Sequence, residues 1–179
     1  NSGYCEIFKH SLISKQNSKF EYLVDCDEID FSSEIIINSI NIKNNFVYED
    51  KYEKKLRKGL NFGHTIGHAI ETHFMSSDKK LLHGEAIAIG IIIESYLSKE
   101  IYGFDIEKVD KIKNHLLTIF PKIKFNSSSK NNIIKMMEHD KKNIEKEVNF
   151  VLLSDIGKLI FDVNVPNSDI LKAFEYYNE

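Results

Sequence analysis

The stretch Ala86–Ile93 consists only of alanine, isoleucine and glycine, and Glu85 and Glu94 lie at its two ends. A helix that spans a membrane needs about 20 apolar residues, so this run is too short for one. We expect it instead to belong to a helix over His83–Tyr102 that ends at Gly103. Because this helix is apolar nearly all round at its start, other elements have to enclose it. The chain is therefore predicted to fold around it.

The rest of the sequence is also typical of a helical protein. Only two prolines and eight glycines interrupt its 179 residues. Apolar residues at helical spacing predict further helices over 4–14, 32–47, 60–74, 105–119 and 127–139, with caps at Ser32 and within Ser127–Ser129. The helix over 32–47 is expected to have an apolar face of Ile35, Ile36, Ser39, Ile40 and Ile42. A closing helix opens at Pro166 and runs to about Tyr177.

The pattern changes after Glu147, where a β-hairpin is predicted. Val148, Phe150 and Leu152 alternate with Asn149, Val151 and Leu153, and a second apolar run over 159–165 follows the turn residues 155–157. Two such runs around a short glycine-containing turn are typical of a hairpin. The fold class is therefore mainly α with one small β-hairpin near residues 148–165. We expect residues 1–179 to form a single helical domain.

Composition narrows the classes of function. The formal net charge is −3 and the lysines are scattered, so neither nucleic acid nor a membrane is expected as a partner. Cys5 and Cys26 make no disulfide framework, and free thiols together with the lack of an export signal predict a cytoplasmic protein. The sequence contains no G-x-G-x-x-G fingerprint, so a dinucleotide site of the usual Rossmann type is not expected. The chain opens without an initiator methionine, and we interpret it as a fragment of a longer protein.

A group of histidines is the most informative feature for function. His64 and His68 are four residues apart and share one face of a helix, and His83 opens the next helix. Imidazoles at this spacing bind Zn²⁺ well, and Glu6 and Glu71 are candidate carboxylate ligands. A metalloprotease needs glutamate directly after the first histidine, where this chain has threonine, so a protease is not expected. Spacing alone leaves both a metal site and a chance pair of histidines open.

Glycines within the same block indicate close packing. Gly63 and Gly67 each cost a helix about 1 kcal/mol relative to alanine. Such residues are tolerated where a neighbouring helix or a ligand approaches the backbone. From the residues alone, tight helix packing and a ligand site remain equal alternatives.

Several segments together resemble the dehydroquinate synthases, a family of the sugar phosphate cyclase superfamily. The main ones are NFGHTIGHAIE at 61–71 and HGEA at 83–86. The segment GYCEIFKHSLI at 3–13 is similar to the family's G-x-A-E-x-x-K-x-x-L-I, with Cys5 where alanine is usual. Lys43, Glu53 and Arg57 occur in the family's order, and DKKN at 140–143 and VLLSDIG at 151–157 resemble its later segments. The likeness covers essentially the whole chain.

The resemblance implies a role for each matching residue. The residues that match the family's metal ligands are Glu6, His64 and His83, which would hold Zn²⁺ or Co²⁺. His68 would instead line the substrate pocket and help to move protons. The positions that surround the substrate's carboxylate, hydroxyls and phosphate are Lys9, Lys43, Arg57, Asn61 and one of Lys141 and Lys142. Glu53 matches a carboxylate near the substrate. NAD⁺ is bound mainly by an N-terminal α/β domain that this chain lacks.

The activity implied is conversion of 3-deoxy-arabino-heptulosonate 7-phosphate to 3-dehydroquinate and phosphate, in the shikimate pathway of aromatic amino acid biosynthesis. The enzyme is a lyase that recycles its NAD⁺, and its active site lies between two domains, so the isolated chain is expected to be inactive. Family analogy favours a homodimer. The alternatives are another cyclase, such as an inosose or valiolone synthase, a metal-dependent polyol dehydrogenase, or a helical interaction module with a structural metal. A structural zinc takes four protein ligands, and the resemblance supplies three.

Overall fold

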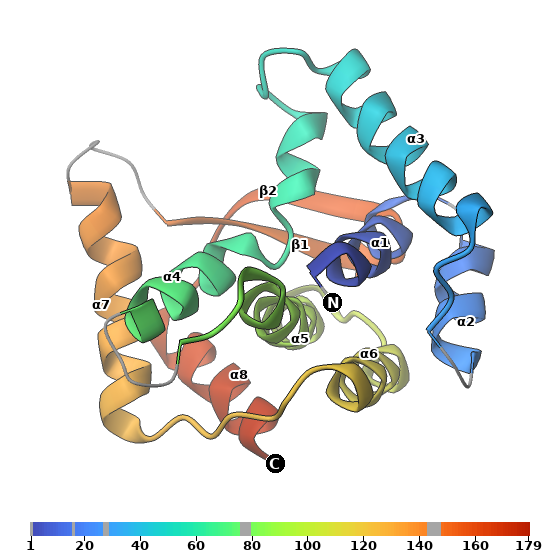
Figure 1. The fold of residues 1–179 in the computed structure, drawn as a ribbon. Coiled ribbons are helices and arrows are strands. Elements are labelled where there is room, and N and C mark those ends of the chain that lie inside the picture. Colours follow the sequence, from blue (N-terminus) through green and yellow to red (C-terminus); the bar gives the residue numbers. More distant parts are fainter. Residues whose placement is uncertain (1, 16, 27–28, 76–79, 143–147) are drawn as a thin grey trace.

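Helix α5 (His83–Tyr102) lies at the centre of the computed structural model, which describes residues 2–15, 17–26, 29–75, 80–142 and 148–179. Helices α1 (Ser2–Ile13), α4 (His64–Met75), α6 (Ile106–Ile119) and α8 (Asn167–Asn178) pack around it (Figure 1), together with strand β1 (Asn149–Asp155). Every residue of α5 from Ala86 to Ser95 is buried. The prediction of an enclosed central helix is confirmed, and Gly103 ends it with a φ of 70°.

Most of the predicted helices occur within three residues of their expected bounds. This holds for α1, α5, α6 and α8, for α3 (Ser33–Glu49) and for α7 (Ser127–Lys142). Ser32 caps α3 as expected, since its Oγ accepts a hydrogen bond from the N–H of Ile35 at 3.4 Å. The cap of α7 is different from the prediction, because the Asn126 side chain rather than a serine accepts from the N–H of Ser129, at 2.8 Å.

Three details of the helix prediction are wrong. The segment expected as one helix over 60–74 is a 3₁₀ turn, η1 (Leu56–Asn61), followed by α4, because Gly63 has a φ of 80° and interrupts the helical path. Helix α2 (Asn17–Asp25) was not predicted. On α3, the chain buries Ser39, Ile42 and Phe46, whereas Ile36 and Ile40 of the expected apolar face are exposed. The buried stripe of α3 is thus rotated from the predicted one.

The predicted hairpin is confirmed. Strand β1 pairs antiparallel with β2 (Lys158–Asn164), with Leu153 opposite Leu159. The N–H of Gly157, in the turn, donates to the carbonyl of Leu12 in α1 at 2.8 Å. All four residues from Phe150 to Leu153 are buried, so both faces of this strand are covered. None of the helices in the described ranges is long and apolar enough to cross a membrane.

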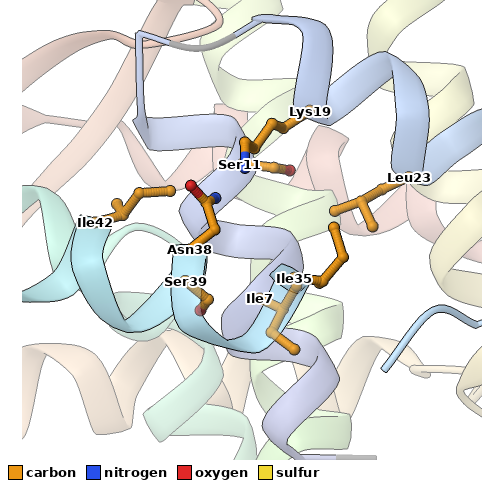
Figure 2. A pocket seen from close by; sticks show the side chains of 8 residues that line it. All are labelled: Ile7, Ser11, Lys19, Leu23, Ile35, Asn38, Ser39 and Ile42. Carbon is orange, nitrogen blue, oxygen red and sulfur yellow. The ribbon is translucent and has the colours of Figure 1, made fainter. Parts of the chain in front are cut away.

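Helix α3 packs over α1 and α2 and leaves a small pocket between the three helices (Figure 2). Its lining is mixed, with apolar and polar side chains: Ile7, Ser11, Lys19, Leu23, Ile35, Asn38, Ser39 and Ile42. Ser39 lines this pocket and also contacts α1, since its Oγ lies 2.6 Å from Nδ1 of His10. The contact between α3 and α1 therefore supports the residues around Glu6.

Candidate metal and substrate site

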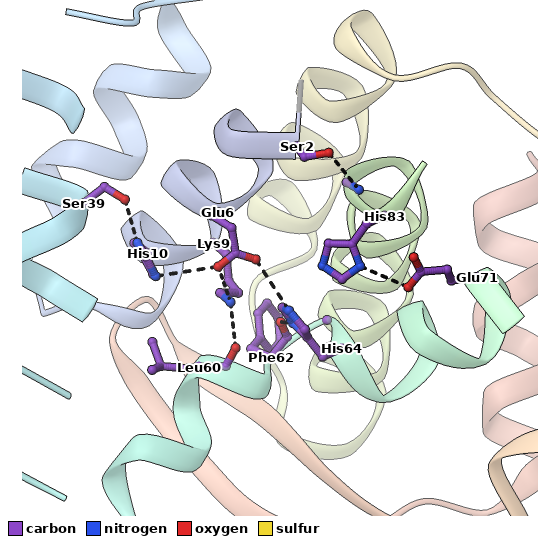
Figure 3. Close-up of polar contacts among 12 residues, drawn as sticks. Ser2, Glu6, Lys9, His10, Ser39, Leu60, Phe62, His64, Glu71 and His83 are labelled. Atoms are coloured by element: carbon purple, nitrogen blue, oxygen red, sulfur yellow. Dashed lines mark hydrogen bonds and ion pairs between the residues drawn. The ribbon is translucent and has the colours of Figure 1, made fainter. Parts of the chain in front are cut away.

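Three helix segments bring the predicted metal ligands together. Glu6 lies in the middle of α1, while His64 and His83 are the first residues of α4 and α5 (Figure 3). Oε1 of Glu6 lies 3.5 Å from Nε2 of His64, and the ring centroids of His64 and His83 are 5.9 Å apart. Residues separated by 77 positions in the sequence thus share one small region, which their order along the chain does not reveal.

The environment of His64 leaves one ring nitrogen available. Its Nδ1 lies 3.2 Å from the carbonyl oxygen of Phe62, which only accepts hydrogen bonds, so Nδ1 carries the proton. Burial lowers the pKa of His64 to about 4, with the nearby charge of Lys9 acting in the same direction. The ring is therefore neutral near pH 7 and directs the lone pair of Nε2 toward Glu6. A neutral imidazole is the form that binds metal ions.

His83 is oriented in a similar way by a carboxylate. Its Nδ1 lies 3.0 Å from Oε2 of Glu71, in α4. A histidine that donates one N–H to a carboxylate keeps its other nitrogen free as a metal ligand, and this pairing also fixes the ring orientation. Glu71, which spacing alone made a candidate ligand, is instead placed as the partner of His83.

The contact between Glu6 and His64 has the spacing of two ligands on one divalent ion. In a tetrahedral zinc site with bonds of about 2.0–2.1 Å, neighbouring ligand atoms are about 3.3–3.4 Å apart. The observed 3.5 Å between Glu6 and His64 is close to that spacing. A carboxylate oxygen facing an imidazole lone pair is repulsive unless a cation or a proton lies between them. Oxygen and neutral imidazole nitrogen are both suitable ligands for Zn²⁺.

His68 lies in the same cluster. Among the described residues, the ligand atoms of His64, His68 and His83 all lie within 4.8 Å of one another, and Glu6 is not part of this set. The resemblance to dehydroquinate synthases implies the set with Glu6, and His68 as a substrate residue. The two sets differ in one ligand, which makes them separable by substitution.

A buried lysine and a second histidine surround Glu6. Nζ of Lys9 lies 2.7 Å from Oε2 of Glu6 and donates to the carbonyl of Leu60 at 2.7 Å. Burial acts to raise the pKa of Glu6, but the charge and hydrogen bond of Lys9 outweigh it, and the pKa lies below its usual value. Nε2 of His10 is 3.9 Å from the same carboxylate oxygen. Glu6 is therefore ionised near pH 7.

The buried His10 predicts a measurable dependence of stability on pH. Burial, followed by the charge of Lys9, lowers the pKa of His10 from 6.5 to about 4. Between these values the unfolded chain takes up a proton that the folded chain does not, so stability falls as the pH drops through this window. For the metal-free protein we expect His10→Gln to reduce this fall by about 3 kcal/mol, as measured by urea unfolding at pH 7 and pH 4. Parallel curves for the two proteins would contradict this.

The predicted substrate residues form a second group beside the first. Asn61, at the end of η1, donates to Oε1 of Glu53 at 2.9 Å, and Nε of Arg57 is 3.8 Å from Oε2 of Glu53. Glu53 has a φ of 54°, which is uncommon for a residue with a side chain. Lys9 links the two groups, because Leu60, whose carbonyl it contacts, precedes Asn61.

Two other parts of the predicted site lie on helices α3 and α7. Lys43 is exposed on α3, and its positive charge contributes to lowering the pKa of Lys9. Lys141 and Lys142 end α7, and their side chains lie outside the described part of the chain. The roles that the resemblance implies for all these residues stay predictions.

The structure also reveals a residue that sequence reasoning did not assign. Glu94 of α5 is fully buried, and its carboxylate accepts hydrogen bonds from the N–H groups of Gly63 at 2.6 Å and Ile66 at 3.2 Å. Burial raises the pKa of Glu94 to about 8, although these backbone donors act in the opposite direction. An acidic residue at the end of an apolar run was the available signal in the sequence.

Comparison with solved structures identifies the class of protein. A 2-deoxy-scyllo-inosose synthase complexed with carbaglucose-6-phosphate, NAD⁺ and Co²⁺ matches with a TM-score of 0.71 and 25% identity. A 2-epi-5-epi-valiolone synthase of Streptomyces hygroscopicus, with NAD⁺ and Zn²⁺ bound, also has a TM-score of 0.71, at 18% identity. Each match covers 98% of this chain and 50% of the other. The fold is that of the sugar phosphate cyclases.

Sequence comparison gives the family within this class. Residues 3–143 match the family described as 3-dehydroquinate synthase C-terminal, and the chain belongs to it. The 3-dehydroquinate synthase of Parabacteroides distasonis is 36% identical over 99% of this chain and 51% of its own length. That of Leptospira interrogans is 37% identical over 96% of this chain and 48% of its own length. The chain thus spans about half the length of these curated relatives.

Proposed function

We propose that this chain is the metal- and substrate-binding domain of a 3-dehydroquinate synthase. The reaction is conversion of 3-deoxy-arabino-heptulosonate 7-phosphate to 3-dehydroquinate and phosphate, which makes the enzyme a carbon–oxygen lyase of the shikimate pathway. The observation that carries the proposal is the convergence of Glu6 with His64 and His83, at the first residues of α4 and α5. The names of the curated relatives support this substrate among those of the cyclases.

The metal that we propose is Zn²⁺ or Co²⁺, bound by Glu6, His64 and His83. A divalent ion supplies Lewis-acid chemistry that polarises the oxygen atoms of a bound substrate. The protein's contribution is to orient both imidazoles, through the carbonyl of Phe62 and the carboxylate of Glu71. Three protein ligands leave room for substrate, as a catalytic site requires.

The charged side chains around this site suit a substrate that is anionic at both ends. We propose that Lys9, Lys43 and Arg57 bind its carboxylate and phosphate, since lysine offers a mobile charge and arginine a planar fork for oxyanions. Asn61 and Glu53 are joined by a hydrogen bond and suit hydroxyl groups. We propose that His68, whose ring is next to those of both other histidines, transfers a proton. One of Lys141 and Lys142 completes the set.

We propose that the NAD⁺ site lies mainly in the half of the relatives that this chain does not match. Both solved cyclases contain NAD⁺, and this chain covers half of each. We propose that the chain alone does not turn over, because the substrate has to lie between this domain and a nucleotide-binding domain. The same analogy favours a homodimer, and the free thiols Cys5 and Cys26 fit a cytoplasmic location.

The proposal is tested by phosphate release from the complete two-domain protein with NAD⁺ and Zn²⁺. We expect release from 3-deoxy-arabino-heptulosonate 7-phosphate, no net formation of NADH, and no release by the 179-residue chain alone. Efficient release from a hexose phosphate or a different heptulose phosphate instead would favour an inosose or valiolone synthase, to which the solved structures are similar. Net NADH formation would indicate a polyol dehydrogenase, and a folded state that requires zinc would indicate a structural metal.

A further inference from the structure

Glu94 is a carboxylate in a costly position. It is 0% exposed and lies on α5, the helix that begins with His83. Removing a carboxylate from water costs several kcal/mol unless hydrogen bonds compensate for the lost hydration. The salt bridges of the described residues do not include Glu94, and its compensation comes from backbone N–H groups. The role of Glu94 therefore depends on the backbone N–H groups that it binds.

The groups that Glu94 binds are those of the first turn of α4. The first N–H groups of a helix have no partner within the helix, and a side chain at the N-cap normally accepts from them. Here the carbonyl of Gly63 accepts the first helical bond, from Gly67 at 3.1 Å, and glycine has no side chain to act as a cap. The two oxygens of Glu94 replace it, one on Gly63 and the other on Ile66.

His64 lies between these two anchored residues. Its backbone is therefore held by a side chain of α5, while its ring faces Glu6 of α1. The same carboxylate fixes the start of α4 relative to the helix that carries His83. We propose that Glu94 is a positioning residue for the metal centre, which holds the first turn of α4 so that His64 presents Nε2 to the ion. This inference rests on the proposed metal site.

The test compares Zn²⁺ affinity in two variants of α5 with the unaltered protein. Glu94→Gln keeps the size of the side chain but turns one acceptor into a donor that faces a backbone N–H. Mutation of a residue that orients a metal ligand typically lowers metal affinity by about 10–100-fold. We expect Glu94→Gln to lower Zn²⁺ affinity by a factor in this range, measured by competition with a chromophoric chelator. The Co²⁺ absorption spectrum is expected to change as well, because the coordination of His64 is altered.

Ser98→Ala is the matched control. Ser98 is also a fully buried polar residue of α5; its Oγ donates to the backbone carbonyl of Glu94 at 2.7 Å and accepts from the backbone N–H of Leu153, in β1, at 2.9 Å. Its loss removes buried hydrogen bonds of the same helix but leaves those of the Glu94 carboxyl group in place, so it should lower thermal stability and leave the Zn²⁺ dissociation constant within about twofold. If Glu94→Gln lowers stability to a similar extent with an unchanged dissociation constant, the role is structural only and the proposal is wrong.

A second substitution covers the case in which Glu94→Gln does not fold. Glu94→Asp keeps the carboxyl group but shortens the side chain, so we expect it to weaken Zn²⁺ binding severalfold while Ser98→Ala does not; equal affinities would overturn the proposal. Failure of the metal site itself has a different signature, since the unaltered protein would then bind no Zn²⁺. That result overturns the proposed function together with this inference.

Discussion

Replacement of His64 by alanine is expected to weaken Zn²⁺ binding by about 10²–10³-fold and to abolish turnover of the complete enzyme. Structural zinc sites with four ligands bind with roughly 10–16 kcal/mol, so one ligand contributes about 2.5–4 kcal/mol. His64 is the proposed ligand with the best-defined surroundings, because its Nδ1 lies 3.2 Å from the Phe62 carbonyl oxygen and its Nε2 is 3.5 Å from Glu6. Chelator competition measures the affinity, and phosphate release measures the turnover.

Two other histidines of α4 serve as controls for this prediction. The ring of His73 packs edge-to-face with that of Phe74, at the other end of the helix, and His73→Ala should leave both quantities unchanged. His68→Ala should retain Zn²⁺ affinity within a few-fold but reduce turnover. A loss of affinity in His68→Ala as large as that in His64→Ala would show that the ion uses three histidines, and that the assignment of Glu6 as a ligand is wrong.

Gly90→Ala is expected to destabilise the protein by about 3 kcal/mol, although alanine is the better helix former by about 1 kcal/mol. A Cβ at this position would lie 2.0 Å from the carbonyl oxygen of Gly63 and 2.9 Å from the backbone nitrogen of Gly67. Both neighbours are backbone atoms of the start of α4, so the two helices have to move apart. The movement also displaces His64, and Zn²⁺ binding should weaken with stability. Urea unfolding at equilibrium gives the change in free energy.

The matched control is Gly3→Ala in α1. No atom lies within 4 Å of a Cβ at this position, so the intrinsic helix preference alone should act. We expect a change between zero and about 1 kcal/mol in the stabilising direction. If Gly90→Ala behaved like Gly3→Ala, the close approach of α4 and α5 at these glycines would not be a constraint on the fold.

Much of the fold follows from local patterns in the sequence. The apolar run Ala86–Ile93 predicted a helix enclosed by others, and alternation after Glu147 predicted the hairpin; both depend on periodicity, which is a local property. The break at Gly63 was missed because its φ of 80° is imposed by the packing of α4 on α5. The buried stripe of α3 was misplaced since isoleucines occur on several of its sides, and contact with α1 decides which are covered.

The candidate site, like the fold, could be predicted from the sequence only in part. Spacing alone grouped His64 with His68 and made His83, Glu6 and Glu71 further candidates, and the family resemblance selected Glu6, His64 and His83. Neither could find the hydrogen bonds that orient these side chains. Glu71 and Glu94 bind residues of other segments, and the contact of Phe62 with His64 depends on the backbone turn at Gly63. Lys9 illustrates the difference, since a lone lysine is usually a solvated charge, yet this one is 2% exposed and bound to Glu6. Its burial depends on the approach of η1 to α1.

Diffraction at the zinc absorption edge, from crystals of the zinc-loaded protein, is the most direct measurement of the metal assignment. One anomalous peak per chain is expected, within about 2.0–2.2 Å of a Glu6 carboxylate oxygen and of a ring nitrogen of both His64 and His83. A peak on His68 in place of Glu6, or zinc bound only elsewhere on the protein, would contradict the account.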